Sequence, residues 1–234
     1  MIELRPFAGL GTFKNEWLNA HYHFSFSHYR HPERMGFGAL LVWNDDEIAP
    51  HTGFGPHPHK DMEIITFVRQ GAITHRDSLG NEGATRAGDV QVMHAGSGIT
   101  HAEVNQEAEV TRLFQIWIQP DEKGVQPGWS ARAFPRAAGQ GLQVLASGDA
   151  AAQAAGALAL HADAAVLAAR LQPGERAHYT LAPGRAAYLV PATGEIEVNG
   201  IIVQARDGVA LAGESEIRIE AMAAAEIVLV EVRA

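Results

Sequence analysis

The stretch Met62-Glu-Ile-Ile-Thr-Phe-Val68, followed across Gln70-Gly71 by Ala72-Ile-Thr-His-Arg76, decides the class of fold. Both runs are rich in the β-branched and aromatic residues that favour strands, and the glycine between them is typical of a hairpin turn. Two further runs of this kind, 89–93 and 112–118, follow after clusters of turn residues. Short strands separated by turns predict a β-sandwich or barrel rather than βαβ units.

The second half of the chain predicts another set of strands. Residues 150–171 are rich in alanine, and propensity alone would favour a helix there. We expect any helix to stay within the neighbourhood of Asp149 to Ala155, because strand patterns dominate afterwards. Asn199-Gly200 is a strong hairpin turn between two of these strands. The expected strands of this half are 186–190, 195–199, 201–203, 216–219 and 227–232.

The segment from Gln119 to Gly141 contains three prolines and four glycines, which predicts a linker. We therefore expect two domains, residues 1–135 and 136–234, each forming a β-barrel. The chain has 234 residues, of which 47% are hydrophobic, so two such cores are possible.

Composition excludes several classes of function. The formal net charge of -9 disfavours direct binding to nucleic acid, which requires lysine and arginine to neutralise phosphates. Cysteine is absent, so disulfides, thiolate metal ligands and cysteine nucleophiles are excluded. Neither a signal-peptide core nor an apolar run of 18 residues is present, and we expect a cytoplasmic protein with no membrane association.

Histidine is unusually concentrated, because nine of the 12 lie before residue 95. Within Gly53-Phe-Gly-Pro-His57-Pro-His59, two of them stand two residues apart on extended chain. Side chains at this spacing face the same side of a strand and can converge on one ion. The prolines stiffen the pair and indicate an edge or bulged strand. A lone pair of this type is weak evidence, since His21-Tyr-His23 repeats it.

A companion segment strengthens the case for a metal. In Thr100-His101-Ala102-Glu103, a third histidine and a carboxylate again stand two apart. Three imidazoles and one carboxylate suit Fe(II) or one of its first-row neighbours, with positions left open for ligands. Glu63 has the same parity as His57 and His59, so spacing leaves open whether Glu63 or Glu103 supplies the carboxylate.

A longer block of sequence resembles the pirin family. It runs from His75-Arg-Asp-Ser-Leu-Gly80 through Ala87-Gly-Asp-Val-Gln-Val-Met93 to Ala95-Gly-Ser-Gly-Ile-Thr-His101-Ala-Glu103. The segments Phe24-Ser-Phe-Ser-His28-Tyr29 and Phe114-Gln-Ile-Trp117 are similar to pirins as well. The resemblance covers about residues 20–120, whereas the second half resembles the family only in size and strand character.

The resemblance implies an all-β bicupin fold, two jelly-roll barrels in tandem, with one metal ion in the first barrel alone. It implies the ligands His57, His59, His101 and Glu103, and a quercetin 2,3-dioxygenase activity with Glu103 as the catalytic base. Glu63 is then expected to orient a ligand imidazole. Fe(II) is the metal we expect, with Cu, Ni, Co, Mn or Zn as alternatives. His94 is expected to be a loop residue or a proton carrier, and His161 and His178 to be structural.

Three functions follow from this interpretation. The first is a dioxygenase that cleaves a flavonol such as quercetin with O₂ and releases carbon monoxide. The second is a metal-binding regulatory or redox-sensing protein that acts through protein partners, as eukaryotic pirins are linked to transcription cofactors. The third is the same site acting on another enolisable compound. An apolar pocket of flavonol size would favour an enzyme over a sensor.

Overall fold

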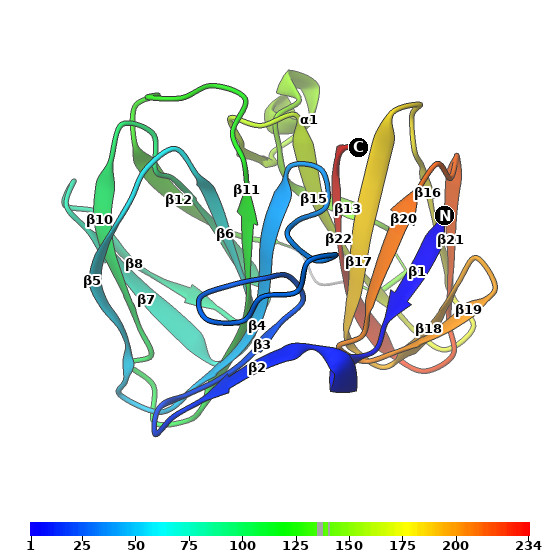
Figure 1. Ribbon diagram of the computed structural model, residues 1–234, viewed down its shortest axis with the longest axis horizontal. Helices are drawn as coiled ribbons and strands as arrows, with labels where there is room; N and C mark the ends of the chain where they lie inside the picture. Colours follow the sequence, from blue (N-terminus) through cyan, green and yellow to red (C-terminus); the bar gives the residue numbers. More distant parts are fainter. Residues whose placement is uncertain (135–137, 140) are drawn as a thin grey trace.

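The computed structural model describes residues 1–134, 138–139 and 141–234. Two β-barrels lie side by side, the first in blue to green and the second in yellow to red (Figure 1). Within the described residues, each barrel combines a seven-stranded sheet with a four-stranded sheet. The all-β bicupin prediction is therefore confirmed. The predicted boundary between residues 135 and 136 lies outside the described residues, and the division there stays a prediction.

The first barrel holds the histidine-rich part of the chain. Its four-stranded sheet begins at an edge strand, β5, which contains both prolines of the predicted histidine pair. The edge position agrees with the prediction, because proline cannot donate a ladder hydrogen bond. In spatial order the strands are β5 (Gly53–His59), β10 (Ile99–Val104), β7 (Ala72–Asp77) and β8 (Glu82–Arg86), facing β12 (Gly128–Ala133), β9 (Asp89–His94), β6 (Glu63–Gln70), β11 (Thr111–Ile118), β4 (Leu40–Ile48), β3 (Leu18–Tyr22) and β2 (Gly11–Lys14).

The second barrel repeats this arrangement. Its one α-helix in the described chain, α1 (Ala150–Ala154), begins where Asp149 accepts a hydrogen bond from the Ala152 N–H, as expected. No helix among the described residues has the length and apolar character needed to cross a bilayer. In spatial order the strands are β1 (Ile2–Arg5), β20 (Gly208–Ala212), β17 (Arg185–Thr193), β22 (Ala225–Arg233), β15 (Ala164–Leu171), β13 (Gln143–Ser147) and β14 (Leu158–Ala159), facing β16 (Arg176–Thr180), β21 (Glu216–Ala221), β18 (Glu195–Val198) and β19 (Ile201–Gln204).

Two strands depart from the simple order of the halves. β1 pairs with β20, so the start of the chain completes a sheet of the second barrel, as the blue arrow beside the orange one shows (Figure 1). β12 pairs with β9 inside the segment predicted to be a linker, which corrects that prediction. Glycine and proline flank β12, but Trp129 within it packs against His75 and anchors the strand.

The two seven-stranded sheets pack against each other through one shared apolar core. β4, β6, β9 and β11 contribute alternate side chains, among them Trp43, Ile65 and Phe114. The second barrel contributes Tyr188 and Val228, and all five residues are at most 1% exposed. Because burial of apolar surface is favourable, the two barrels are more stable together than either barrel would be alone. Separating the halves would therefore expose this core to water.

Polar contacts across the same interface reinforce the packing. Asp45 is fully buried and pairs with Arg69 of its own barrel and with Arg206 of the other. The His23 Nδ1 and the Tyr188 hydroxyl form a second buried contact of 2.9 Å across the interface. A buried charge is tolerated only when it is paired, so separating the barrels would leave Asp45 poorly compensated.

A fragment containing residues 1–134 should therefore be poorly soluble, although it includes all four predicted ligands. It would expose the apolar face of β4, β6, β9 and β11 to water, and such faces promote aggregation. Soluble yield and sedimentation of the fragment, compared with the whole chain, measure this effect. A monodisperse fragment with native-like circular dichroism would contradict it.

Candidate metal centre

Three histidines of the first barrel lie together on two neighbouring strands. His57 and His59 come from β5, and His101 comes from β10, directly opposite His57 in the antiparallel register. Each residue offers one ligand atom, and these atoms lie within 4.8 Å of one another. Among the described residues this is the one such group of metal-binding side chains. The predicted histidine triad is thus brought together by the fold.

Two of the imidazoles are held in a defined tautomer. The Nδ1 of His57 lies 2.7 Å from the Gly55 carbonyl oxygen, which only accepts, so this nitrogen carries the proton. The Nδ1 of His101 lies 3.4 Å from the Nδ1 of His75, and the Nε2 of His75 lies 2.9 Å from Asp77 Oδ2. Since the Asp77 carboxylate accepts, His75 donates through Nε2 and its Nδ1 accepts from His101. Nε2 of both His57 and His101 is left free for a metal.

The Asp77 carboxylate, which ends this series of hydrogen bonds, is itself fixed. Burial raises the pKa of Asp77, but the hydrogen bonds from His75 and Asn81 outweigh burial and lower that pKa overall. His75 is fully buried and stacks on Trp129, with ring centroids 4.9 Å apart and planes within 5°. Trp129 also lies over Gly83, where a Cβ would come within 2.4 Å of the indole. Glycine at that position leaves room for the ring that orients His75.

The electrostatics of the triad favour neutral imidazoles. Burial, together with the neighbouring His101 and His57, lowers the pKa of His59 to about 4. Burial and the charges of His57 and His75 lower the pKa of His101 to about 3. The Nε2 atoms of His59 and His101 are buried and have no hydrogen-bond partner among the described residues. Neutral, unpartnered imidazole nitrogens converging on one point are what a divalent metal requires, so these residues fit such an ion.

Glu103 lies beside the triad and is held by a row of polar side chains. Its Oε1 accepts hydrogen bonds from Thr66 (3.1 Å) and Gln91 (2.6 Å), and its Oε2 accepts one from Gln115 (2.7 Å). The three donors are neighbours in register across β9, β6 and β11. The charge of Glu103 partly opposes the lowering of the His59 pKa, so the carboxylate acts electrostatically on the triad. Glu103 is not among the atoms that lie within 4.8 Å of one another, and its role as fourth ligand stays a proposal.

The two glutamines cannot turn their amide groups round without losing partners. The Oε1 of Gln91 accepts from Thr85 (2.8 Å) and from the Trp129 indole (3.3 Å). The Oε1 of Gln115 lies 3.4 Å from the Trp117 indole nitrogen. Both amides therefore present their NH₂ groups to Glu103, which fixes its carboxylate as an acceptor.

Glu63 does not belong to this centre, contrary to the expectation that it orients a ligand imidazole. Its Oε2 lies 2.6 Å from the Nδ1 of His94, at the end of β9, and accepts from the His161 backbone N–H at 3.1 Å. The parity argument fails because the chain turns between β5 and β6, where Asp61 has a φ of 49°. Glu63 instead joins the first barrel to the loop before β15 of the second.

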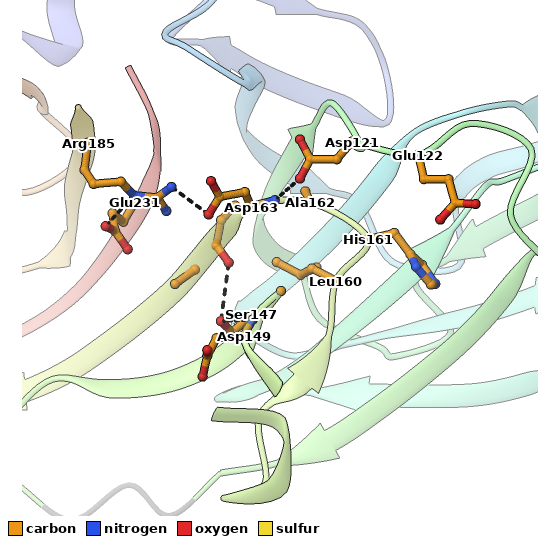
Figure 2. A pocket seen from close by; sticks show the side chains of 13 residues that line it. Asp121, Glu122, Ser147, Asp149, Leu160, His161, Ala162, Asp163, Arg185 and Glu231 are labelled. Atoms are coloured by element: carbon orange, nitrogen blue, oxygen red, sulfur yellow. Dashed lines mark hydrogen bonds and ion pairs between the residues drawn. The ribbon is translucent and has the colours of Figure 1, made fainter. Parts of the chain in front are cut away.

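The histidines of the second half lie elsewhere. His161 lines another pocket, of about 490 Å³, and its ring packs edge-on against His94 with centroids 4.7 Å apart. Figure 2 shows its side chain apart from the ion pair between Asp163 and Arg185, whose atoms are 2.7 Å apart. His178 is exposed on β16 and contacts Glu216. Their predicted structural role stays a prediction, consistent with these contacts.

A cavity of about 350 Å³ opens beside the triad. His57 and His59 form part of its wall, and half of the other lining residues are aromatic. The volume and the apolar lining are typical of small-molecule sites, which measure about 300–1,000 Å³. The aromatic residues that line it are Phe13, Trp17, Tyr22, Phe26, Phe54 and Trp117.

Fold and site together define a bicupin with a histidine metal centre in the first barrel. The model of the Pirin family matches residues 5–118, and that of the quercetinase C-terminal cupin domain matches residues 144–232. The chain belongs to the pirin family. The second match extends the relationship over the half in which sequence inspection alone found only strand character.

Individual relatives agree with this assignment over their whole length. A Pseudomonas aeruginosa protein provisionally named as a quercetin 2,3-dioxygenase is 58% identical, covering 99% of this chain and 100% of its own. The quercetin 2,3-dioxygenase of Escherichia coli K12 is 40% identical, and the match covers 98% of this chain and 97% of that protein. The crystal structure of the bacterial pirin YhhW of Escherichia coli in complex with nickel(II) matches with a TM-score of 0.93 and 39% sequence identity. The match covers 100% of this chain and 99% of that chain. The expected likeness to quercetin 2,3-dioxygenases is thus confirmed, and the imidazole cluster supports a single divalent metal.

Replacing His57, His59 or His101 by alanine should remove most of the bound metal, because each removes one converging nitrogen. Elemental analysis after dialysis should give one ion per chain for the parent and a small fraction of that for each variant. His21→Ala and His178→Ala are the controls, since both lie outside the cluster, and they should keep the parent stoichiometry. Full metal content in any of the three triad variants would reject the assignment.

His75→Ala should weaken metal binding by roughly 10- to 100-fold, although His75 is not expected to touch the ion. Loss of the partner that fixes a ligand's tautomer has effects of this size. The affinity is measured by competition with a chromogenic chelator at constant pH. His75→Asn should restore part of the affinity, because an amide oxygen can accept from His101 Nδ1; equal loss in both variants would show that His75 acts through packing alone.

Proposed function

We propose that this protein is a metal-dependent dioxygenase that cleaves flavonols such as quercetin, consuming O₂ and releasing carbon monoxide. The observation that carries the proposal is the pairing of an imidazole triad with an aromatic cavity of small-molecule size. A planar polyphenol can stack on Trp17, Phe54 or Trp117 while an oxygen at its edge reaches the triad. The names of the relatives point to the same substrate.

The triad and Glu103 would hold the metal, which supplies Lewis acidity toward the substrate's oxygens and toward O₂. Fe(II) remains the metal that we propose, since three imidazoles and one carboxylate suit it, while nickel(II) is the ion seen in a related structure. The location of the protein in the cytoplasm is likewise a proposal.

Glu103 would act as the base. The 3-hydroxyl of a flavonol is acidic because a carbonyl lies beside it, and a carboxylate within about 2.6–3.2 Å of its oxygen can take the proton. Gln91, Gln115 and Thr66 fix the position of the acceptor before substrate arrives, and this saves reorganisation during proton transfer. Addition of one O₂ and cleavage of the central ring then convert C₁₅H₁₀O₇ into a C₁₄H₁₀O₈ ester and CO, which balances all atoms.

The aromatic walls would contribute by excluding water. Seven of the twelve lining residues other than the two histidines are aromatic or aliphatic, and they would limit the access of water to a bound flavonol anion. A purely regulatory metal site has no need of such a cavity, and for this reason we favour the enzyme over the sensor. The regulatory alternative, with protein partners, predicts metal binding without consumption of O₂.

The test is to load the metal-free protein anaerobically with Fe(II), Ni(II), Cu(II), Co(II), Mn(II) or Zn(II) and then add quercetin and oxygenated buffer. One O₂ consumed and one CO released per quercetin, measured by electrode and by haem-binding of CO, would support the proposal. Absence of turnover with every metal, in protein that holds one ion per chain, would reject it in favour of the regulatory alternative.

Glu103→Gln should lower the rate of flavonol cleavage by at least about 10²-fold, as expected for loss of a general base. It should also weaken metal binding, because the amide lacks the charge and its NH₂ would face one of the two donors, Gln91 or Gln115. Glu63→Gln is the matched comparison and should lower both quantities less, since Glu63 contacts His94 instead of the triad. The opposite ranking in initial rates and metal affinity would show that the wrong carboxylate was assigned.

A further inference from the structure

The cavity beside the triad contains two buried polar side chains that contact neither the proposed metal ligands nor Glu103 in any hydrogen bond of the described residues. Asn44 and Asp46 both lie on β4, two residues apart, and therefore project from the same face of the strand. Both line the cavity together with His57 and His59. The lining also includes Asn15 and Ser27, which are exposed, and Gln115, which already donates to Glu103.

Both side chains are buried and incompletely satisfied. Asp46 is 2% exposed and Asn44 is 4% exposed. Among the residues that the structure describes, neither Asp46 Oδ1 nor Asn44 Oδ1 has a hydrogen-bond partner. Buried polar atoms are almost always paired in folded proteins, because leaving one unpaired destabilises the fold. Two of them on one wall of a small-molecule cavity indicate that a ligand supplies the missing partners.

We propose that Asp46 and Asn44 bind a polar edge of the substrate. They would select for aromatic ligands that carry oxygen substituents in addition to the adjacent hydroxyl and carbonyl groups that reach the metal. This inference rests on the proposed function of the same site and adds the groups that determine its specificity. The metal-binding end of the ligand would be held at the triad, while its other hydroxyl or carbonyl groups meet the wall formed by β4.

The state of Asp46 suits this role. Burial raises the pKa of Asp46 well above its ordinary value, and the charges of Asp45 and Glu103 act in the same direction against the opposing Arg69. A protonated carboxyl group donates one hydrogen bond and accepts others, and the Asn44 amide does both as well. The pair therefore matches phenolic and carbonyl oxygens, whereas an ionised carboxylate there would repel a flavonol anion.

A site that pairs a polar group of its ligand rejects the analogue that lacks it, because its own buried atoms are then left unpaired. The experiment compares quercetin with 3-hydroxyflavone, which keeps the hydroxyl and carbonyl beside each other but lacks the remaining hydroxyls. Both are titrated without O₂ into protein loaded with one metal ion, and binding is followed by quenching of tryptophan fluorescence. We expect the parent to bind quercetin at least about tenfold more tightly, a ratio that corresponds to one hydrogen bond.

Asp46→Leu should abolish this preference while keeping the affinity for 3-hydroxyflavone within about threefold of the parent. Asp46→Asn, which keeps a donor in nearly the same shape, should retain most of the preference. Glu47→Gln is the control on the same strand, because Glu47 contacts Asn19 and Arg112 outside the cavity. Its preference should equal that of the parent.

An equal loss of affinity for both ligands in Asp46→Leu, an unchanged preference, or loss of the metal ion would each overturn the inference. So would a parent that binds neither flavonol. The titration is carried out without O₂, so it tests binding alone. If the protein shows the expected preference but consumes no O₂ when oxygen is added afterwards, the dioxygenase proposal is rejected and the role of Asp46 stands. The two proposals thus fail separately.

Discussion

Apolar contact between the two seven-stranded sheets is the constraint on which the rest of the structure depends. In β4, β6, β9 and β11, the residues that pack into the shared core alternate with residues that face the interior of the first barrel. Trp43, Ile65, Val92 and Phe114 face the core. The residues between or beside them are Asn44, Thr66, Gln91 and Gln115, and these occupy successive strands in register.

This alternation explains why a polar row exists inside a β-barrel. Once the second half covers one face of the sheet, the other face is free to carry side chains that serve chemistry. Three members of the row donate to Glu103, and the fourth, Asn44, continues it into the cavity. The second half, whose described residues contain no such triad, thus determines which face of this sheet carries the polar residues of the site. The opposite sheet supplies the imidazoles, so the metal centre lies between the two sheets of one barrel.

The sequence predicted the parts of this arrangement that are local. Paired histidines on an extended strand, a third histidine with its carboxylate, and a short helix after Asp149 all depend on spacing within a few residues. The strand β12 was missed because glycines and prolines on either side resemble a linker, whereas its stability comes from pairing with β9. Glu63 was misplaced because one residue with positive φ, Asp61, ends the alternation on which parity depends.

Other parts could not be predicted because they depend on pairing between distant strands. The support of Glu103 by Gln91 and Gln115, and of His101 by His75, requires the register of β6, β7, β9, β10 and β11. A signal was nevertheless present, since a single polar residue interrupts each apolar run, as in Ile64-Ile-Thr-Phe-Val68 and Phe114-Gln-Ile-Trp117. Such interruptions at inward positions of buried strands indicate groups that meet a partner inside the barrel.

The pairing of β1 with β20 has a consequence for how the chain acquires its structure. Ile2 lies opposite Leu211, so β1 leaves the ribosome well before β20, the strand with which it pairs. At roughly 5–20 residues per second, β1 waits about 10–40 s for its partner. During that interval its backbone donors and acceptors are unpaired, and exposed strand edges invite pairing with other chains. The first strand is short, and Pro6 follows it directly, a combination that limits the length of edge available to a wrong partner until synthesis brings the right one.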